Sequence, residues 1–503
     1  MIAVRNWLDR VTGRVTMYRL VNLVLSALLV IAIAAGAIGQ VSYAPLDILV
    51  AAAVAVVVTF ASSWLFARLF RTRAHLESSL ITGLLLAFLF RPTLDGAELG
   101  SIALAAVIAS ASKYLLAIRR RHIFNPAAIG AFIVSLTGLN FAVWWAGTPA
   151  LLPFVIIGAF LVLYRSHRLV MGSTFVVLAV ALFTLQYSLG GMAVGAALWS
   201  AVGSSPVIFL AGFMLSEPLT LPPRRWQQLG LAVVVALLLT TPFSFPPLYN
   251  SPELALVVGN VLAFAVGQRR GIRMDYLGRT QLTPTSWEFS FRPQRAVRYV
   301  PGQYMELSVP HSGADQRGHR RVFSIASAPG GDVRFGLRIA EKSSSFKTSL
   351  LTLEPGEIVT GTSIAGDFVL PRDAQRPLLL VAGGIGITPF VSQLEHLEAT
   401  GAQRDVVIVY ASSSPDEIAY AERIASGGHR VLLVSPTEPA DLPSTWTWLG
   451  AGPLTGDLLL KSVADAAQRD AFVSGAPALV TSMKQALRRA GVRHVKSDYF
   501  SGY

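Results

Sequence analysis

The sequence divides sharply near residue 270, and this break constrains the fold more than any other feature. Residues 18–268 form nearly continuous apolar runs, whereas residues 274–503 have the mixed texture of globular domains. Only 14% of all residues are charged, below the roughly one quarter typical of soluble domains. We therefore expect a multi-span α-helical membrane domain over residues 1–270, with water-soluble domains after it.

The basic residues of the apolar half lie mainly in short arginine clusters between the apolar runs. Each cluster follows an even-numbered run, so all clusters fall on one face, which the excess of positive charge predicts to be cytoplasmic. The chain is then predicted to be a multi-pass protein of the cell membrane with both termini in the cytoplasm. This topology accounts for the net charge of +13, and no nucleic-acid partner is predicted. The ten apolar segments, or about ten predicted helices, are residues 18–40, 46–68, 76–91, 97–117, 126–145, 149–165, 169–187, 191–216, 228–243 and 252–268.

The apolar half contains an internal repeat marked by prolines. Pro92 and Pro126 are 34 residues apart, and so are Pro218 and Pro252. The two halves are offset by five segments, an odd number, so the repeat must be inverted across the membrane. Broken helices at matching places of inverted repeats predict a binding site near the midplane, because they free backbone groups that lipid cannot satisfy. The residues predicted for this site are Thr82, Asn125, Pro126, Ser216, Glu217, Pro218 and Thr220.

Three stretches of the apolar half, residues 112–114, 121–128 and 213–220, resemble one family of membrane proteins. This NqrB/RnfD family comprises related membrane proteins of sodium-pumping NADH:quinone reductases and of the Rnf complex. The Ser-Gly-Ala-Thr stretch that carries covalent FMN in that family is absent here. A second flavin in the membrane domain, FMN or riboflavin, would therefore be held without a covalent bond.

Beyond residue 273 the apolar runs become short and alternate with polar residues. Strand patterns at 287–291, 304–309 and 333–338, separated by Gly and Pro turns, predict an antiparallel β-barrel domain over residues 274–373. Within it, an Arg fork at Arg321 can clamp a pyrophosphate in bidentate fashion. Phe323 can stack on a flavin ring, and the hydroxyl of Ser324 can reach the reactive nitrogen of that ring.

A β-α-β pattern begins at residue 376 and predicts a parallel α/β nucleotide-binding domain over residues 376–503. Its first strand, 377–381, runs into the glycine turn 383–386, and an apolar helix follows. Glycines let the backbone approach a phosphate, and a helix start favours the negative charge.

Taken together, the motifs of residues 276–503 resemble the ferredoxin–NADP reductase family. The resemblance implies bound FAD and a nicotinamide nucleotide, NAD(P)H, as electron donor. Phe323 replaces a commoner Tyr, and Ser474 replaces the Cys of a Cys-Gly-x-Pro motif, but hydride transfer depends on stacking and alignment rather than on a strong base. By the resemblance, the catalytic residues are Ser324, Ser474 and Phe500, and the cofactor-binding residues are Arg321, Phe323, Ser324, Ser345, Phe346, Lys347, Gly384, Gly386, Thr388, Pro389, Gly475 and Pro477.

The choice between NADH and NADPH depends on charge. A 2′-phosphate needs Arg or Lys near the adenosine ribose, but the loop after the second strand, residues 412–417, is polar and acidic. The sequence therefore favours NADH slightly.

The sequence lacks the side chains that would bind the usual metal-containing electron carriers beyond FAD. The chain has no cysteine for iron–sulfur clusters, no metal site is predicted, and His75, His122 and His167 lie too near predicted cytoplasmic ends to pair as haem ligands. A flavin or quinone at the broken helices remains. In one hypothesis the membrane domain conducts electrons to an extracytoplasmic acceptor, for example a flavoprotein partner, or to quinone. Alternatively, it is a transporter that the fused reductase drives or regulates.

Overall fold

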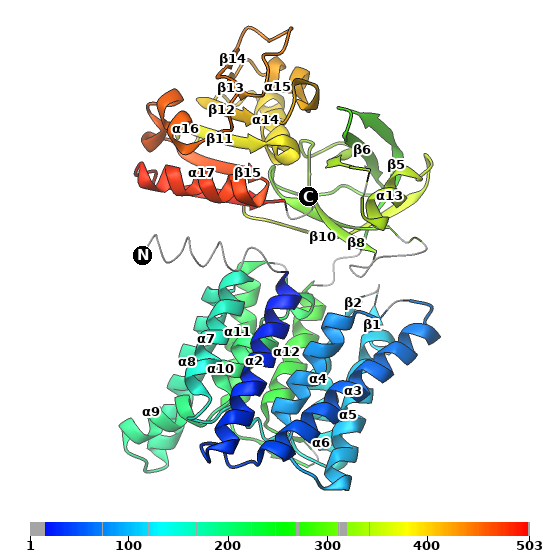
Figure 1. Cartoon of the computed structure of the whole chain (residues 1–503), viewed down its shortest axis with the longest axis vertical. Coiled ribbons are helices and arrows are strands. Elements are labelled where there is room, and N and C mark those ends of the chain that lie inside the picture. The colour runs from blue at the N-terminus through cyan, green and yellow to red at the C-terminus, as the bar shows by residue number, and fades with distance from the viewer. Residues whose placement is uncertain are drawn as a thin grey trace. The chain divides into compact units, whose positions relative to one another are not determined.

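The computed structural model describes residues 16–72, 74–118, 121–166, 168–222, 224–246, 248–267, 271–309, 311, 319–341 and 343–500. The chain forms two compact units. The described residues up to Gly267 form the helical unit, and those from Gly271 onward form the C-terminal unit. Figure 1 shows helices throughout the helical unit and a mixture of strands and helices in the C-terminal unit.

Each of the ten predicted apolar segments contains helical structure. The segment 191–216 is divided by a bend of 44° between Gly203 and Val207, where Pro206 lacks the backbone donor that a continuous helix needs. The helices are α2 (Met17–Ala37), α3 (Pro45–Leu69), α4 (Leu76–Leu89), α5 (Gly96–Leu115), α6 (Pro126–Thr137), α7 (Leu152–Arg165), α8 (Leu169–Leu189), α9 (Val194–Gly203), α10 (Val207–Phe209), the π-helix η1 (Leu210–Leu215), the 3₁₀-helix η2 (Pro218–Thr220), α11 (Arg225–Thr240) and α12 (Pro252–Gly267).

Few of these helices are long enough to cross a membrane. Among the described residues, four helices (α2, α3, α5 and α8) have the required length and apolarity, or five if the bent pair around residue 205 counts as one span. A 14-residue helix such as α4 rises only about 21 Å, less than the hydrocarbon thickness of about 30 Å. The helical unit thus has the composition of a membrane protein, but the prediction of about ten spanning helices is not confirmed.

Helix packing repeats between the two halves of the helical unit. Helix α3 packs on α5 and α2 on α4 in the first half, and α8 packs on α11 and α7 on η1 in the second. These pairs correspond when the halves are offset by five segments, as the predicted repeat requires. Its inversion across a membrane stays a prediction.

The first part of the C-terminal unit is an antiparallel sheet. Its strand order is β8-β7-β10-β5-β6-β9, and alternate residues such as Met305, Leu307 and Phe335 are buried in one core. The predicted barrel is not closed in the described part of the chain, where β8 and β9 are the two edges of the sheet and are not paired with each other. Just after β8, the Ala326 N–H donates to the Arg334 carbonyl (2.8 Å) and the Arg334 N–H donates to the Ser327 hydroxyl (3.1 Å). The strands are β5 (Ile272–Gln281), β6 (Ser286–Pro293), β7 (Tyr304–Ser308), β8 (Arg320–Ser324), β9 (Val333–Arg338) and β10 (Ile358–Ala365), and helix α13 spans Ser345–Leu351.

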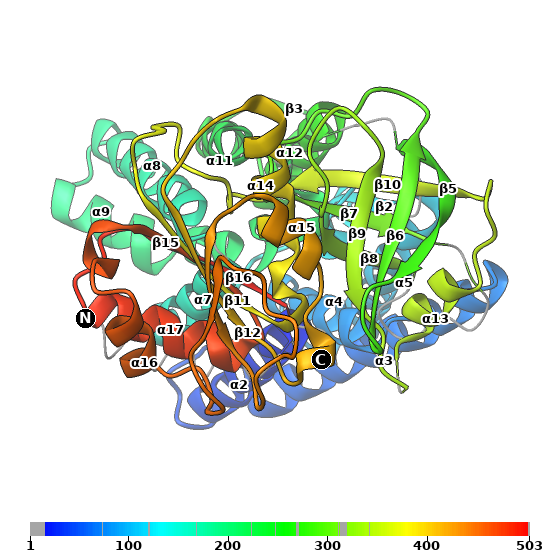
Figure 2. The ribbon, with the colours of Figure 1, turned by 90° about the horizontal axis from the view of Figure 1, so that it is seen from above.

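The second part is the predicted parallel sheet, with strand order β14-β13-β12-β11-β15-β16. Its strands are nearly uninterrupted apolar runs because helices cover both faces. Helices α14 and α15 pack in one core and α16 and α17 in the other, on opposite sides of β11 and β12 in Figure 2. The elements are β11 (Leu378–Gly383), η3 (Gly384–Ile387), α14 (Thr388–Thr400), β12 (Val406–Ala411), α15 (Ala421–Ser426), β13 (Arg430–Val434), β14 (Trp446–Trp448), α16 (Gly456–Ser462), β15 (Asp470–Gly475), α17 (Pro477–Arg489) and β16 (Val495–Tyr499).

Candidate functional site

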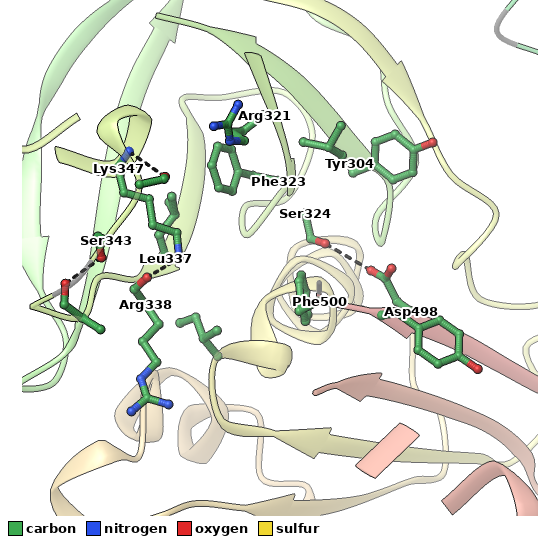
Figure 3. A pocket seen from close by; sticks show the side chains of 16 residues that line it. Tyr304, Arg321, Phe323, Ser324, Leu337, Arg338, Ser343, Lys347, Asp498 and Phe500 are labelled. Atoms are coloured by element: carbon green, nitrogen blue, oxygen red, sulfur yellow. Dashed lines mark hydrogen bonds between the residues drawn. The ribbon is translucent and has the colours of Figure 1, made fainter. Parts of the chain in front are cut away.

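A pocket of about 690 Å³ opens in the C-terminal unit, between the antiparallel sheet and the end of β16. Side chains from the sheet, from the start of α13 and from the C-terminal residues point into it (Figure 3). It is lined by Tyr304, Arg321, Val322, Phe323, Ser324, Gly336, Leu337, Arg338, Ala340, Ser343, Ser344, Lys347, Ile385, Asp498, Tyr499 and Phe500.

Strand β8 supplies a cation and an aromatic ring to this pocket. Alternation along the strand places Arg321 and Phe323 on the same side of the sheet. The Arg321 guanidinium lies 5.5 Å from the ring centre of Phe346, and the Phe323 ring lies 5.6 Å from the same residue. Phe346 is fully buried, so it forms the floor that supports both side chains rather than a pocket wall.

A second cation reaches the pocket from helix α13. Its capping residue is Ser344, whose Oγ accepts a hydrogen bond from the Lys347 backbone N–H (3.4 Å). The Lys347 ammonium donates to the Arg338 carbonyl at 2.6 Å, which holds it at the pocket wall. Ser345 lies just outside the lining, where its hydroxyl contacts Nε2 of His311 at 3.1 Å. Two cations, Arg321 and Lys347, with neighbouring hydroxyls are the chemistry that binds a pyrophosphate.

Opposite these cations, Ser324 meets a carboxyl group from the last strand. The Ser324 hydroxyl donates to Oδ2 of Asp498 at 3.2 Å, a contact visible in Figure 3. Burial raises the pKa of Asp498, the hydrogen bonds from Ser324 and the Tyr499 backbone oppose that rise, and the nearby Asp367 charge adds to it. The pocket therefore has a cationic end and an end with a hydroxyl–carboxyl pair.

The C-terminal residues are positioned by parallel pairing of β16 with β15. Ser474 is the register partner of Asp498, and Gly475 is that of Tyr499. The Phe500 N–H then donates to the Gly475 carbonyl at 3.0 Å, which fixes the backbone beside the pocket. Ser474 is fully buried, and its hydroxyl has no hydrogen-bond partner among the described residues.

The glycine turn packs directly against this strand end. A Cβ on Gly386 would lie 2.6 Å from the Gly475 Cα and 2.7 Å from the Ser474 carbonyl oxygen, so only glycine allows the approach. Gly384 has a φ of +51°, which lets the chain turn from β11 into η3. The Thr388 hydroxyl donates to the Ile385 carbonyl at 3.1 Å. Two motifs that are distant in sequence thus meet.

The structure brings only part of the predicted set into the pocket. Arg321, Phe323, Ser324, Lys347 and Phe500 line it. The predicted residues of the glycine turn and of the end of β15 do not line the pocket. Of the turn, Ile385 is the residue that lines it. These residues outside the lining are Gly384, Gly386, Thr388, Pro389, Ser474, Gly475 and Pro477.

Sequence reasoning missed Tyr304, Arg338 and Asp498. Asp498 stands two residues before the predicted Phe500 in a half-apolar strand. A carboxylate at such a position, close to a predicted catalytic residue, was the signal that could have identified it.

Residues predicted for the membrane site make contacts between separate helices. The Lys113 ammonium, on α5, donates to the Thr82 hydroxyl at 2.9 Å and to the Ser78 carbonyl at 3.2 Å, both on α4. The His122 Nε2 and Glu217 Oε1 atoms are 2.8 Å apart. Glu217 also lies within electrostatic range of Lys113. Lys113 and His122, which the predicted site left out, therefore belong to one polar cluster with Thr82 and Glu217.

A second group joins the start of α6 to the other half of the unit. The Asn125 N–H donates to Oδ1 of Asn260 at 2.8 Å, and its side-chain amide reaches the Met214 carbonyl at 3.5 Å. Pro126 is the first residue of α6. The Ser216 and Thr220 hydroxyls donate to carbonyls nearby in sequence, those of Gly212 and Glu217 (2.7 and 3.3 Å). Pro218 begins η2. Among the described residues, no group of three or more His, Asp or Glu could hold a metal ion.

Comparison with known proteins identifies the C-terminal unit. Residues 380–485 match the family described as "Oxidoreductase NAD-binding domain". The chain is 29% identical over 213 residues to the toluate 1,2-dioxygenase electron transfer component of Pseudomonas putida, covering 40% of this chain and 58% of that protein. It is 27% identical over 232 residues to the NADH oxidoreductase HCR of Escherichia coli (strain K12), covering 46% and 68%.

A flavohemoprotein of Oceanobacillus iheyensis is 29% identical over 133 residues, which are 25% of this chain and 32% of that protein. The chain thus spans less than two thirds of the length of this relative and of the toluate dioxygenase component. Among solved structures, the flavohem-like FAD/NAD-binding domain of nitric oxide dioxygenase from Vibrio cholerae is similar, with 21% identity and a TM-score of 0.39, over 46% of this chain and 99% of that one.

From these sequence matches, the C-terminal unit contains an oxidoreductase NAD-binding domain and resembles electron-transfer and NADH-oxidoreductase proteins. The resemblance of the helical unit to the NqrB/RnfD family stays a prediction.

Proposed function

We propose that the chain is a membrane-bound NADH-oxidising flavoprotein. Electrons pass from NADH to FAD in the C-terminal unit, then to a second carrier in the helical unit, and finally to an extracytoplasmic acceptor or to quinone. The pairing of a reductase module with helices of membrane-spanning length and apolarity supports this proposal. Both termini and the reductase module then lie in the cytoplasm, where reduced nicotinamide nucleotides are.

The pocket residues have separable roles in this proposal. Arg321 and Lys347 bind the FAD pyrophosphate, Phe323 packs on the ring system, and the Ser324–Asp498 pair sits at the reactive edge. FAD supplies the ability to take two electrons from a nucleotide and release them singly. Phe500 covers the ring until the nucleotide arrives, and the Gly384–Ile387 turn with Gly475 carries the nucleotide.

Two loops support NADH as the donor. In a parallel sheet the nucleotide lies at the carboxyl ends of the strands, which places its adenosine near the loops after β12 and β13. Residues 412–422 and 435–445 contain no Lys or Arg and carry acidic side chains, among them Asp416 and Glu438. The phosphate of NADPH would meet repulsion and no cation there.

The observation that carries the membrane step is a pair of buried acceptors in the helical unit. The Glu217 Oε2 and Asn22 Oδ1 atoms are buried and have no hydrogen-bond partner among the described residues. Asn22 and Lys113 bond to adjacent residues of α4, at the carbonyls of Glu77 and Ser78. A buried acceptor left without a donor costs about 1–3 kcal/mol. The cluster therefore favours a ligand that brings donors to two acceptors and carbonyls to one cation.

A flavin meets this requirement better than a quinone. The imide edge of its ring carries an N–H between two carbonyl groups, and its ribityl chain carries hydroxyls. The N–H suits Glu217, a carbonyl suits Lys113, and a hydroxyl suits Asn22. An oxidised quinone head offers acceptors only, so both buried acceptors would stay unsatisfied. We therefore propose FMN or riboflavin, held without a covalent bond, as the membrane carrier.

A transporter coupled to the reductase is the second candidate. Glu253 is 3% exposed and accepts a hydrogen bond from Nε1 of Trp144 at 2.9 Å. An ionisable residue buried in a membrane unit commonly marks a path for ions or protons. The shortage of further carboxylates inside the spans makes this candidate the weaker one.

Reconstitution into proteoliposomes separates the two candidates. NADH is added outside to vesicles that contain the intact chain and a trapped, membrane-impermeant electron acceptor such as ferricyanide. The electron-transfer proposal expects trapped acceptor to be reduced at the rate of NADH oxidation by outward-facing molecules. NADH oxidation that never reduces trapped acceptor or membrane quinone, but drives solute or ion flux, would favour the transporter.

A further inference from the structure

Helix α14 docks onto the antiparallel sheet side of the C-terminal unit through polar side chains. The Ser392 hydroxyl donates to the Ser327 carbonyl at 2.6 Å. The Gln393 amide donates to the Phe368 carbonyl at 2.7 Å. The Glu395 carboxylate accepts from Nη2 of Arg334 at 2.6 Å. Three neighbouring residues of one helix thus bind three separate places on the facing side.

The third contact extends into a ladder of ion pairs. Arg423, on α15, lies 3.3 Å from Glu395 and 2.9 Å from Glu288, which belongs to β6. Glu395 also accepts from the Ala328 N–H at 3.1 Å. Arg334 and Glu288 come from the antiparallel sheet, whereas Glu395 and Arg423 come from the nucleotide-binding part. Charges therefore alternate across the junction between the two parts.

This docking face differs from the apolar face of the same helix. Phe390, Leu394 and Leu397 pack in the core of the parallel sheet, whereas Ser392 and Gln393 are fully buried polar residues at the junction. Buried ionic and polar contacts add little net stability, because their desolvation offsets most of their attraction. They are directional, however, so they fix the relative placement of the surfaces that they join.

The placement matters because α14 begins at the nucleotide turn. Thr388 starts the helix directly after η3, and Ile385 of that turn lines the pocket together with Ser324. Any rotation of α14 on its docking face would move the turn relative to the proposed flavin edge. In the reaction a hydride leaves the dihydronicotinamide, which becomes the oxidised pyridinium, and the flavin gains two electrons and a proton.

We infer that Ser392, Gln393 and Glu395 are positioning residues that set the distance over which this hydride travels. The inference rests on the proposed nucleotide position. Hydride transfer is steeply sensitive to geometry, and a misplacement of about 1 Å can slow a reaction about a hundredfold. These side chains touch neither FAD nor nucleotide in this account, so they act through α14 alone.

The test measures FAD reduction in a single turnover of the intact, detergent-purified chain. Glu395→Gln keeps the side-chain shape and removes the charge that faces Arg334 and Arg423. Glu398→Gln, on the exposed side of the same helix, is the matched control. At saturating NADH we expect Glu395→Gln to reduce FAD about tenfold more slowly, with full FAD content and a larger primary isotope effect from deuterated NADH. The control should match the wild type.

Ser392→Ala provides a second, milder variant, because it removes only the bond to the Ser327 carbonyl. We expect a smaller loss of the same rate. Wild-type rates in both variants would overturn the inference, as would a rate loss in Glu395→Gln that only follows loss of FAD. A wild-type chain whose FAD neither NADH nor NADPH reduces would instead overturn the proposed function.

Discussion

The two polar sites of this chain differ in how completely their groups are satisfied. In the C-terminal pocket, Lys347 and Ser324 already have acceptors at 2.6 and 3.2 Å. In the helical unit, Glu217 Oε2 and Asn22 Oδ1 are buried without partners among the described residues. Two kinds of observation can therefore indicate the ligand of a site. For the C-terminal pocket the indication is a recognisable set of residues along the chain. For the helical unit it is the buried acceptors that lack hydrogen-bond donors.

The largest effect is expected at the cationic end of the pocket. Arg321→Ala removes a charged, bidentate donor, which is worth about 2–3 kcal/mol in such a site. FAD binding should weaken by about a hundredfold, so that the purified variant has little FAD and does not oxidise NADH. Arg292→Ala, which removes an exposed cation from the same sheet, is the control. Full FAD content in Arg321→Ala would place the pyrophosphate clamp elsewhere.

A smaller effect is expected in the helical unit. Glu217→Gln replaces the buried acceptor partly by a donor, and Lys113→Met removes the cation at nearly constant length. Each should reduce the amount of the second flavin by about tenfold and leave one FAD per chain. Asp47→Asn, near the start of α3, tests the loss of a charge elsewhere in the helical unit. Unchanged second-flavin content in both site variants would show that the orphan acceptors do not mark the site.

Nucleotide choice should show a moderate effect that is confined to the C-terminal unit. The acidic loops predict that kcat/KM is at least about tenfold higher for NADH than for NADPH, because one charge-assisted contact to the 2′-phosphate is missing. Glu438→Arg should narrow that ratio mainly by improving NADPH use. Equal use of both nucleotides by the wild type would contradict this interpretation of the loops.

The smallest effect concerns Asp498. Burial raises the pKa of its carboxyl group in the folded protein. Such a group contributes stability below the pKa of the unfolded state and loses it as the pH rises through the folded pKa. Asp498→Asn, which cannot ionise, should therefore unfold at a higher temperature than the wild type at pH 7. Thermal unfolding across pH should show the gain shrinking towards pH of about 4. A gain that is independent of pH would show that Asp498 does not titrate in this way.

Local patterns predicted the main strands and motifs of the C-terminal unit. The runs that became β6, β7 and β9 alternate in burial, those that became β11 and β12 are continuous apolar runs, and the Arg321–Ser324 stretch is contiguous. The prediction of a closed barrel was wrong because closure depends on whether two edge strands meet. No local sequence pattern encodes that contact. Asp498 was missed for a similar reason, since its importance comes from a register with Ser474 and a contact with Ser324.

The helical unit was harder to predict because apolar composition does not determine helix length. Segment 76–91 is predominantly apolar, yet its helix ends at Leu89, before Pro92. Lys113 and His122 were left out of the predicted site, although their contacts at Thr82 and Glu217 tie the site together. Such contacts join helices that are distant in sequence, so they can be found only in three dimensions.

The central claim is that the helical unit holds a second carrier, and it can be tested by counting carriers. The intact protein is purified in mild detergent and denatured, and FAD, FMN, riboflavin and quinone are then quantified per chain. Our account predicts one FAD plus about one FMN or riboflavin released without proteolysis. A quinone instead of the second flavin would correct the identity of the carrier. One FAD with no other carrier, in protein that still transfers electrons across proteoliposomes, would contradict the account.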